Sequence, residues 1–409
     1  LLPELTVAEN IYLGREPRTA LPGFISRSAI ERLARRDLAE CGVAIDAAAK
    51  VDHLSIAERQ LVEIVKGVSA APRVLILDEP TSSLTVTEIG ELFAIARRLA
   101  ARGTAIVYIS HKLDEIFALT DRVTVLRDGR KVATATTGEW TEAALVRAMV
   151  GRDLSALFPH TPATPGPVRL AVAGLARRGS FGPVSFALRA GEIVGLYGII
   201  GAGRTELAEA LFGLAPADSG TIEVDGRALS IRSPRAALAA GIAMSPEDRH
   251  ARGLVPMLAV GENLSLSALA LFTSGGFVNR RAERASVEQF LKALLVRARS
   301  ASQEVAALSG GNQQKVVIGR SLMPGPRILL LDEPTRGIDV VAKAEVHASI
   351  DRLAHDGLAV LLISSELPEI LGMSDRILVM RNGLIVGEVA RADAGEERLV
   401  AMAAGARHD

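Results

Sequence analysis

Two stretches of this chain repeat one another. LSIAERQ at residues 54–60 returns as LSGGNQQ at 308–314, and LILDEPT, which ends at Thr81, returns as LLLDEPT, which ends at Thr335. Both pairs are 254 residues apart, and the same spacing relates ISHKLDEI to ISSELPEI and Asp121 to Asp375. A repeat of this length predicts two similar domains in tandem.

The two copies begin at different points. LTVAEN at residue 5 matches LAVGEN at residue 258, so a one-residue gap aligns the copies in this region. The second copy begins near Val168, and nothing in it before Pro256 matches the first copy. In the first copy the matching sequence already starts at Pro3, two residues after Leu1. We therefore expect about 86 residues to be missing from the front of the first domain.

The composition excludes several classes of protein. With 409 residues, 49% of them hydrophobic and 23% charged, the chain is long enough for two full cores. Its formal net charge is zero and its aromatic content is 3%, which argues against a nucleic-acid-binding surface. No apolar run approaches the ~18–20 residues of a membrane helix, so membrane association is expected only through a partner. The single Cys41 excludes an internal disulfide and fits a reducing compartment.

Short β-branched apolar runs alternate with helical stretches in both copies. Such runs predict strands of a parallel sheet that are buried on both faces, joined by helices. The runs lie at residues 74–77, 106–109, 328–331 and 360–363, and the helical stretches at 88–99 and 343–353. Asp-Gly or Asn-Gly dipeptides between alternating runs predict hairpins, and hence a smaller antiparallel piece. They lie at residues 128–129, 225–226 and 382–383.

Four prolines between the copies indicate a short, fairly stiff linker. They are Pro159, Pro162, Pro165 and Pro167. The chain is therefore divided into a first domain at residues 1–155, a linker at 156–168 and a second domain at 169–405.

A glycine-rich turn at residues 198–205 predicts a phosphate-binding loop. The strand-like EIVGLYG leads into GIIGAGRT and a helix-like stretch follows, which matches GxxxxGK[S/T] except that Arg204 replaces the lysine. The glycines let backbone N–H groups surround phosphate oxygens, and the Thr205 hydroxyl can ligate Mg²⁺. Because a planar guanidinium need not fit the slot of an ammonium, binding is more readily retained than efficient hydrolysis. Taken alone, such a turn could also serve only tight packing.

An Asp-Glu pair ends a buried strand in each copy. Asp78-Glu79 and Asp332-Glu333 fall where a parallel sheet presents its ligand-binding edge. The aspartate can hold Mg²⁺ through water, and the glutamate can accept a proton from water attacking a γ-phosphate. Such a pair could merely cap a loop, but its recurrence in LDEPT after the same LS-x-x-x-x-Q element favours catalysis.

These motifs resemble those of the ATP-binding-cassette (ABC) ATPases over essentially the whole chain. In that family LSGGQ is the signature, DEPT ends the Walker B motif, and the histidine of SH is a switch residue. The combination of GAGRTE, PEDR, LSGGNQQK and DEPTRGID is similar to the second half of the tandem ATPase subunits of bacterial ribose-, xylose-, arabinose- and galactose-type importers. These motifs lie at residues 201–206, 246–249, 308–315 and 332–339.

The resemblance implies the fold as well. Two P-loop ABC domains of the α/β class are expected in tandem, each with a mainly parallel sheet, helices and a small antiparallel β subdomain, and the first is incomplete. The motif PEDR places Glu247 where an ordinary half has its Q-loop glutamine.

Two unequal nucleotide sites are also implied. In the family, the phosphate loop of one half faces the signature of the other. The second signature keeps its glycines, whereas the first has Ile56 and Ala57 in their place, and Ser365 occupies the position of the switch His111. Hydrolysis is therefore expected from Asp78, Glu79 and His111 with the second signature, although the phosphate loop of that site is missing. The retained site is expected to hold ATP more than to split it.

The residues implied by motif and resemblance fall into three groups. Those for catalysis are Glu79, His111 and Glu333. Those for ATP are Gly198, Gly201, Ala202, Gly203, Arg204, Thr205, Glu206, Ser309, Gly310, Gly311, Gln313 and Ser55. Those for Mg²⁺ are Thr205, Asp78 and Asp332.

Partners follow from the same resemblance: a membrane permease homodimer and a solute-binding protein, with a peripheral place at the cytoplasmic face of a bacterial cell membrane. The segments at residues 1–13 and 256–271 repeat without nucleotide chemistry and are the implied permease contacts. Two alternatives stay open. One is a soluble tandem-cassette ATPase acting on ribosomes, against which the short linker and the absence of a basic surface argue. The other is a remnant that binds nucleotide without turnover.

Overall fold

The structure is a computed structural model, and it describes residues 1–17, 25–81, 84–110, 112–127, 129–150, 158–162, 164–199 and 201–405. The chain forms two compact units, unit 1 at residues 1–148 and unit 2 at residues 149–409. The division of the chain into domains at 1–155 and 169–405 with a linker between them stays a prediction.

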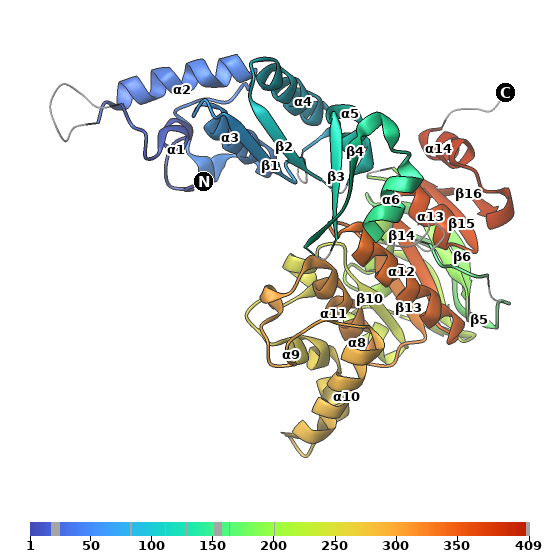
Figure 1. The fold of residues 1–409 in the computed structure, drawn as a ribbon. Helices are drawn as coiled ribbons and strands as arrows, with labels where there is room; N and C mark the ends of the chain where they lie inside the picture. The colour runs from blue at the N-terminus through green and yellow to red at the C-terminus, as the bar shows by residue number, and fades with distance from the viewer. Residues whose placement is uncertain are drawn as a thin grey trace. The chain divides into compact units, whose positions relative to one another are not determined.

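Unit 2 is built around a six-stranded sheet with the order β10-β13-β14-β7-β15-β16 (Figure 1). Only the β15–β16 pair is antiparallel. The strands are β7 (Ile193–Tyr197), β10 (Ile242–Ser245), β13 (Ile328–Asp332), β14 (Ala359–Ser364), β15 (Arg376–Arg381) and β16 (Leu384–Ala390). Every residue of β7, β13 and β14 is buried, as the uninterrupted apolar runs predict.

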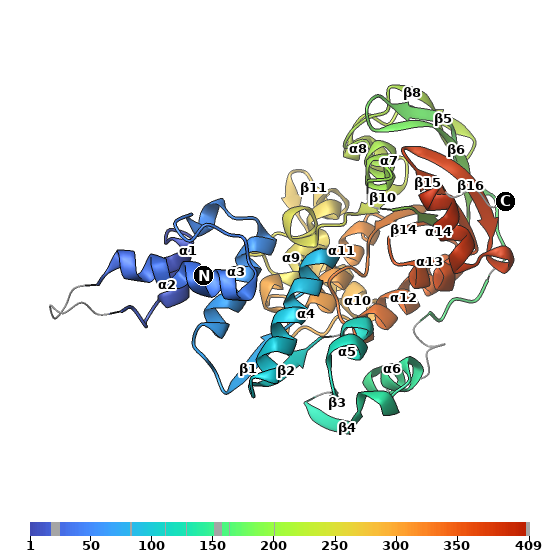
Figure 2. The same cartoon turned by 90° about the horizontal axis from the view of Figure 1, so that it is seen from above.

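A four-stranded antiparallel sheet and two helices cover one face of the six-stranded sheet. The antiparallel sheet has the order β6-β5-β8-β9, and α7 lies between the two sheets, where Leu207 and Leu211 share a core with strands of both (Figure 2). These elements are β5 (Val168–Arg177), β6 (Phe181–Arg189), β8 (Ser219–Val224), β9 (Arg227–Leu229), α7 (Arg204–Phe212) and α8 (Pro234–Ala239). The core of unit 2 therefore fixes the helix that follows the predicted phosphate loop.

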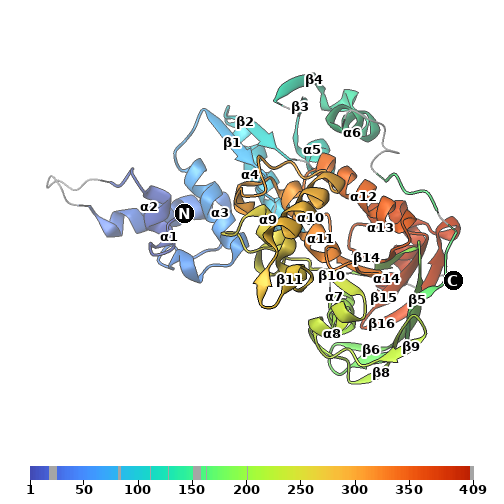
Figure 3. The ribbon, with the colours of Figure 1, turned by 90° about the horizontal axis from the view of Figure 1, so that it is seen from below.

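The opposite face carries α11 (Gly310–Leu322) and α12 (Val340–His355), whose apolar residues pack on β13 and β14. The helices α13 (Leu367–Met373) and α14 (Glu396–Ala404) pack against β15 and β16. The helices α9 (Val260–Ser265) and α10 (Arg280–Ala293) form a separate core with α11, away from β8 and β9 (Figure 3). Two short strands near α10, β11 (Thr273–Ser274) and β12 (Phe277–Val278), pair as a hairpin.

Unit 1 contains counterparts of only part of this arrangement. Its helices are α1 (Val7–Tyr12), α2 (Arg27–Cys41), α3 (Ile56–Val68), α4 (Val86–Ala101), α5 (Leu113–Leu119) and α6 (Glu142–Val150). Its strands form a parallel pair, β1 (Val74–Asp78) with β2 (Ala105–Ile109), and an antiparallel pair, β3 (Arg122–Arg127) with β4 (Arg130–Thr136).

The expectation that the strands of unit 1 are buried on both faces is wrong. Val74, Ile76, Val107 and Ile109 are 45% to 64% exposed. Their counterparts 254 residues later are fully buried in a core that they share with α7 and the antiparallel sheet. Among the described residues of unit 1, β2 pairs only with β1, and no helix corresponding to α7 covers this face. The strands form because of their local sequence, but the burial of one face depends on elements that only unit 2 supplies.

The turn dipeptides form hairpins as predicted. Asp225-Gly226 joins β8 to β9 and Asn382-Gly383 joins β15 to β16, with both residues of each dipeptide at positive φ. The third dipeptide joins β3 to β4, but Asp128 lies outside the described residues.

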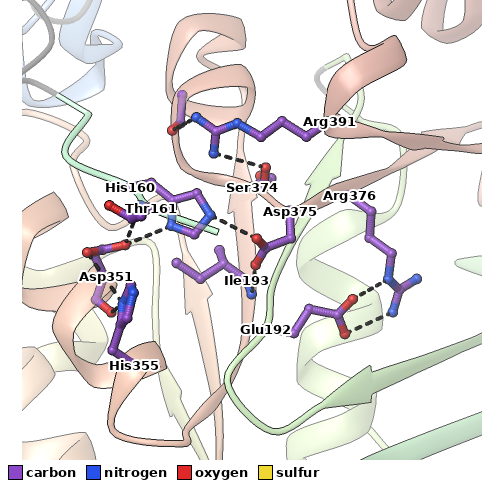
Figure 4. Close-up of polar contacts among 11 residues, drawn as sticks. His160, Thr161, Glu192, Ile193, Asp351, His355, Ser374, Asp375, Arg376 and Arg391 are labelled. Carbon is purple, nitrogen blue, oxygen red and sulfur yellow. Dashed lines mark hydrogen bonds and ion pairs between the residues drawn. The ribbon is translucent and has the colours of Figure 1, made fainter. Parts of the chain in front are cut away.

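Part of the predicted linker is fixed to unit 2. The ring of His160 contacts Asp351 of α12 at 2.7 Å and Asp375 at 3.0 Å, and the N–H of Ile193 donates to the second oxygen of Asp375 (Figure 4). Burial disfavours the charged imidazole, but the two carboxylates outweigh it and raise the pKa of His160. The Phe158 ring lies 5.1 Å from the ring of His347 on α12. These contacts attach the segment to the sheet and helices of unit 2.

Candidate nucleotide-binding site

The predicted phosphate loop connects β7 to α7. Gly201 and Gly203 have φ of 81° and 98°, a region that favours glycine, and a Cβ at Gly198 would collide with the carbonyl oxygen of Met380. The N-terminus of α7 has no side-chain cap, so its backbone N–H groups remain available to an anion. Ile200 lies outside the described residues, while Ala202 is buried at the base of the turn. The described residues of the loop therefore have the glycine conformations and the close packing that the motif predicts.

Asp332 ends β13 beside this loop. Its side chain is fully buried, and neither carboxylate oxygen has a hydrogen-bond partner among the described residues. Burial raises the pKa of Asp332 to about 6, although the nearby Thr205 hydroxyl and the Arg204 charge act in the opposite direction. A buried carboxylate without a partner is costly, which indicates that a further group belongs at this position.

Mg²⁺ fits this position. Thr205 and Asp332 line one cavity of 470 Å³, so a hydroxyl and a carboxylate oxygen are available on its wall. The described residues contain no group of three His, Cys, Asp or Glu side chains placed to hold a metal ion. Mg²⁺ is commonly held by one or two protein oxygens together with waters and phosphate oxygens of a substrate, so the ion would depend on bound nucleotide. Thr205 and Asp332 are the residues that would hold it.

Arg204 contacts a residue that the loop motif does not predict. Its guanidinium lies 3.3 Å from Glu333, and both side chains are buried. Burial raises the pKa of Glu333 to about 7, while the Arg204 charge and the nearby Ser365 hydroxyl lower it. Glu333 also has a φ of 46°, which is uncommon for a residue with a side chain. The Glu333 carboxyl group, which was predicted as a base, therefore has a pKa close to neutral pH. When it is ionised, its charge is balanced by Arg204, which replaces the usual lysine.

The DEPT threonines form a contact that we did not predict. Thr335 donates to Glu369 at 2.9 Å, and Thr81 donates to Glu115 at 2.6 Å. Both glutamates are buried, and each follows its threonine by 34 residues. The recurrence of this glutamate in ISHKLDEI and ISSELPEI was the available signal, because a glutamate repeated within an apolar helix needs buried partners.

The predicted signature residues lie at the N-terminus of α11. Ser309 is the N-cap residue, and its hydroxyl accepts a hydrogen bond from Asn312. Gln313 is buried and donates to the carbonyl oxygens of Val305 and Leu308, so its side chain holds the preceding turn. A Cβ at Gly311 would collide with Ala342 of α12, so this glycine is also required by packing. Contact of these residues with nucleotide stays a prediction.

The unit 1 residues have the same local arrangement where they are described. Glu79 has a φ of 44°, and its N–H donates to Ile109 at 2.9 Å, as the N–H of Glu333 donates to Ile363 at 2.9 Å. Asp78 ends β1 but is exposed, unlike Asp332. Ser55 caps α3 through a reciprocal pair of hydrogen bonds with Glu58. His111 lies outside the described residues.

Comparisons with known proteins agree with this geometry. A family model described as ABC transporter matches residues 1–82 and 181–336. The chain belongs to the ABC transporter family. The solved ATP-binding cassette MJ1267 of an ABC transporter is 22% identical with a TM-score of 0.51, covering 57% of this chain and 98% of that one. This likeness shows the fold alone.

Among its ABC relatives are subunits of importers. The ribose import ATP-binding protein RbsA of Rhodococcus jostii is 47% identical over 405 residues, covering 99% of this chain and 80% of that protein. The ribose import ATP-binding protein RbsA 2 of Rubrobacter xylanophilus is 50% identical over 408 residues, covering all of this chain and 78% of that protein. In the vocabulary of the ABC family, the predicted phosphate loop at residues 198–205 corresponds to Walker A, and the predicted pair Asp332-Glu333 corresponds to the end of Walker B.

Proposed function

We propose that this chain is the ATP-binding subunit of an ABC importer of a monosaccharide. The observation that carries this proposal is the unpartnered Asp332 carboxylate beside Thr205 and the Walker A loop. The ribose importers among the relatives support the class of cargo. We further propose a peripheral place at the cytoplasmic face of the membrane, with a permease homodimer and a solute-binding protein as partners. No helix within the described ranges is long and apolar enough to cross a bilayer.

The bound nucleotide is ATP with Mg²⁺. The backbone N–H groups of residues 201–205 would surround the β-phosphate, and Glu206 lies in the first turn of α7 behind them. A second hollow of 630 Å³, lined by Arg177–Gly182 and Asn382, offers room for the nucleoside. It adjoins the loop, since the carbonyl oxygen of Ser180 and the Cα of Gly383 both lie within 3.4 Å of the position of a Cβ on Gly203.

Equilibrium binding of a fluorescent ATP analogue in the presence of Mg²⁺ tests this site. The full chain is expected to bind, and Gly203→Asp is expected to lose binding, because it adds a negative charge and a side chain at a φ of 98°. Glu223→Gln, an exposed change on β8, is the control and should bind as the parent does. Equal binding by Gly203→Asp and the parent would show that the site is wrong.

Hydrolysis at this site is proposed to be slow. Arg204 neutralises Glu333 instead of leaving it free to accept a proton, and Ser365 stands where the family has its switch histidine. The copy that retains Glu79 and His111 has no glycine-rich phosphate loop among residues 1–155 of this chain. The chain is therefore proposed to bind ATP and barely turn it over, which also keeps a purely nucleotide-binding role as the second candidate.

The segments at residues 1–13 and 256–271 are proposed to contact the permease. Both present exposed apolar side chains: Met257 and Leu271 are 88% and 65% exposed, and Leu2 and Leu13 are 48% and 40% exposed. Exposed apolar side chains of this kind suit an apolar partner surface. Photo-crosslinkers at Leu2 and Met257 should capture a co-expressed permease, whereas one at the exposed Glu223 should not. Capture only from Glu223 would contradict the assignment.

A further inference from the structure

The motif PEDR has no role in the contacts described so far, although it adjoins them. It follows β10 at Pro246–Arg249, and Glu247 and Asp248 line the 470 Å³ cavity with Thr205 and Asp332. By resemblance, Glu247 stands where an ordinary half carries an uncharged glutamine. A carboxylate in a partly enclosed cavity repels the phosphates that the cavity is proposed to admit.

Besides Glu247, two of the five acidic side chains that line this cavity have hydrogen-bond or ion-pair partners close to them. Its carboxylates are Glu206, Glu209, Glu247, Asp248 and Asp332. Glu209 pairs with Arg252 at 2.5 Å, and Asp248 accepts the N–H groups of His250 and Ala251 at 2.9 Å. Asp332 is the proposed Mg²⁺ ligand. Glu206 lies in the first turn of α7, where the helix dipole favours a negative charge. Glu247 is therefore the carboxylate that needs a cation of its own.

That cation is Arg336, which follows the DEPT threonine. Its guanidinium forms an ion pair with the Glu247 carboxylate. The Arg336 side chain is 66% exposed, so the pair contributes little to fold stability, and a long flexible side chain would leave it easily. The position of Arg336 must be held by something other than the pair itself.

Arg249 holds the backbone at this point. Its two terminal nitrogens donate to consecutive carbonyl oxygens, Nη1 to Arg336 at 3.0 Å and Nη2 to Gly337 at 3.2 Å. A Cβ added at Gly310 would lie 3.2 Å from Nη2, so the guanidinium is packed beneath the start of α11. Only arginine offers a rigid fork of donors that spans two adjacent carbonyls.

We propose that Arg249 is a positioning residue: by fixing the backbone at residues 336–337 it keeps Arg336 against Glu247, so that the cavity admits the terminal phosphate of ATP. This inference rests on the proposed function, because it concerns the same nucleotide site. It gives PEDR a role in which the glutamate and the arginine of the motif act together.

The inference is tested by measuring the affinity of the full chain for the fluorescent ATP analogue with Mg²⁺ in variants that expose or remove the Glu247 charge. Arg336→Met exposes the Glu247 charge and should weaken binding about tenfold, and Arg249→Met should weaken it similarly because Arg336 is no longer held. Glu247→Gln breaks the same ion pair but removes the repelling charge, so it should bind as tightly as the parent or more tightly. Raising the salt concentration should reduce the difference in ATP-analogue affinity between Arg336→Met and the parent, because salt screens the repulsion.

The double variant Glu247→Gln/Arg249→Met shows whether Arg249→Met weakens ATP binding through the exposed Glu247 charge or through a folding defect. Since no carboxylate then needs neutralising, it should recover most of the affinity that Arg249→Met loses. If it binds as weakly as Arg249→Met, or if Glu247→Gln alone is equally weak, the motif only supports the fold and the inference is overturned. Arg281→Met, an exposed change on α10, is the matched control. Failure of the parent to bind would instead contradict the proposed function.

Discussion

Glu333 and Arg204 show how one substitution in a loop changes the chemistry of its neighbour. The loop motif predicts a cation for the phosphates, yet Arg204 reaches the Walker B glutamate, and the pair is buried. Burial still dominates, because it raises the pKa of Glu333 to about 7 in spite of the adjacent charge. A pKa near neutral pH suits a base, but a carboxylate that is paired with arginine is less free to accept a proton from water.

The raised pKa of Glu333 predicts how stability depends on pH. Its ordinary value is 4.5, so the folded state binds more protons than the unfolded state between about pH 4.5 and 7. The contribution of Glu333 to stability is thus present at low pH and is lost as pH rises through 7. The loss is on the order of 3 kcal/mol for this shift. Glu333→Gln should flatten the decline in the free energy of unfolding of unit 2 between pH 5.5 and 8.

Denaturant unfolding at these two pH values measures the effect. Glu333→Gln leaves Arg204 without this partner, so the variant is expected to be less stable at pH 5.5, and the informative quantity is the slope with pH. Glu223→Gln, exposed on β8, should keep the slope of the parent. An unchanged slope in Glu333→Gln would mean that another group titrates.

The buried Glu369 and Glu115 are held by different partners in the two units. Glu369 contacts His347 at 2.7 Å, whereas Glu115 accepts from Tyr108 at 2.7 Å. At the repeat spacing, His347 corresponds to Phe93 and Tyr108 corresponds to Leu362. Although burial raises the pKa of Glu369, hydrogen bonds from His347, Ser364 and Thr335 lower it overall. Apart from the shared threonine contact, the equivalent glutamate therefore has a different side-chain partner in each unit.

Because the partner of the buried glutamate differs between the units, the partner used in unit 1 should restore part of the stability that unit 2 loses without His347. His347→Phe should destabilise unit 2 by about 3–5 kcal/mol, because it leaves a buried charge with fewer partners. Adding Leu362→Tyr should recover part of the loss, since it introduces the hydroxyl that unit 1 uses. The single Leu362→Tyr is the control and is expected to be destabilising by overpacking, by about 1–3 kcal/mol. Chemical denaturation of the four proteins gives the coupling energy, and losses that simply add would contradict the idea.

At the scale of strands, equal sequence patterns have unequal environments. The runs at residues 74–77 and 328–331 predict strands equally well, and both form. Their burial differs because β7 extends the sheet beside β14 while α7 and the antiparallel sheet cover its face in unit 2, and the described residues of unit 1 include no such elements. Hydrophobic pattern predicts the element, but what lies against each face depends on residues distant in sequence.

A matched pair of truncations tests this difference. Ile363→Ala should cost about 2–5 kcal/mol, because Ile363 is fully buried in the core between β14 and α7. Ile109→Ala, the same change 254 residues earlier, should cost less than about 1 kcal/mol, because Ile109 is 45% exposed. Hydrogen exchange of peptides covering β14 and β2 separates the two units. Equal losses of protection would show that the outer face of β2 is covered in solution.

For the whole molecule, sequence predicted the motifs better than their interactions. The repeated elements, the strand and helix on either side of the glycine-rich turn, the position of the Asp-Glu pair of unit 2 at the end of β13, and the described hairpin turns were predicted from local patterns and are found in the structure. The Arg204–Glu333 pair, the docking of His160 and the Glu247–Arg336 pair were not predicted. Each joins residues more than 80 positions apart, and side-chain pairing at such separations leaves no periodicity to read.

The distribution of motifs along the chain predicts its turnover. Hydrolysis needs a phosphate loop, a metal-binding aspartate, a base and a stabilising switch residue acting on one nucleotide. The first copy carries Glu79 and His111 but no phosphate loop in this chain, and the second carries the loop with Arg204 paired to Glu333. We therefore expect steady-state phosphate release by the chain to be negligible even where ATP is bound.

Extending the N-terminus with a strand, a lysine-containing phosphate loop and a helix, by analogy with residues 168–212, should create turnover. In the extended protein, Glu79→Gln should remove most of the activity, because it removes the base that accompanies His111. Glu333→Gln should cost far less, since Arg204 already neutralises that carboxyl group. Steady-state phosphate release from the chain, the extended protein and its two variants decides the assignment. Robust release by the unextended chain would place hydrolysis at the loop that begins at Gly198, and equal losses from the two substitutions would mean that both sites hydrolyse ATP.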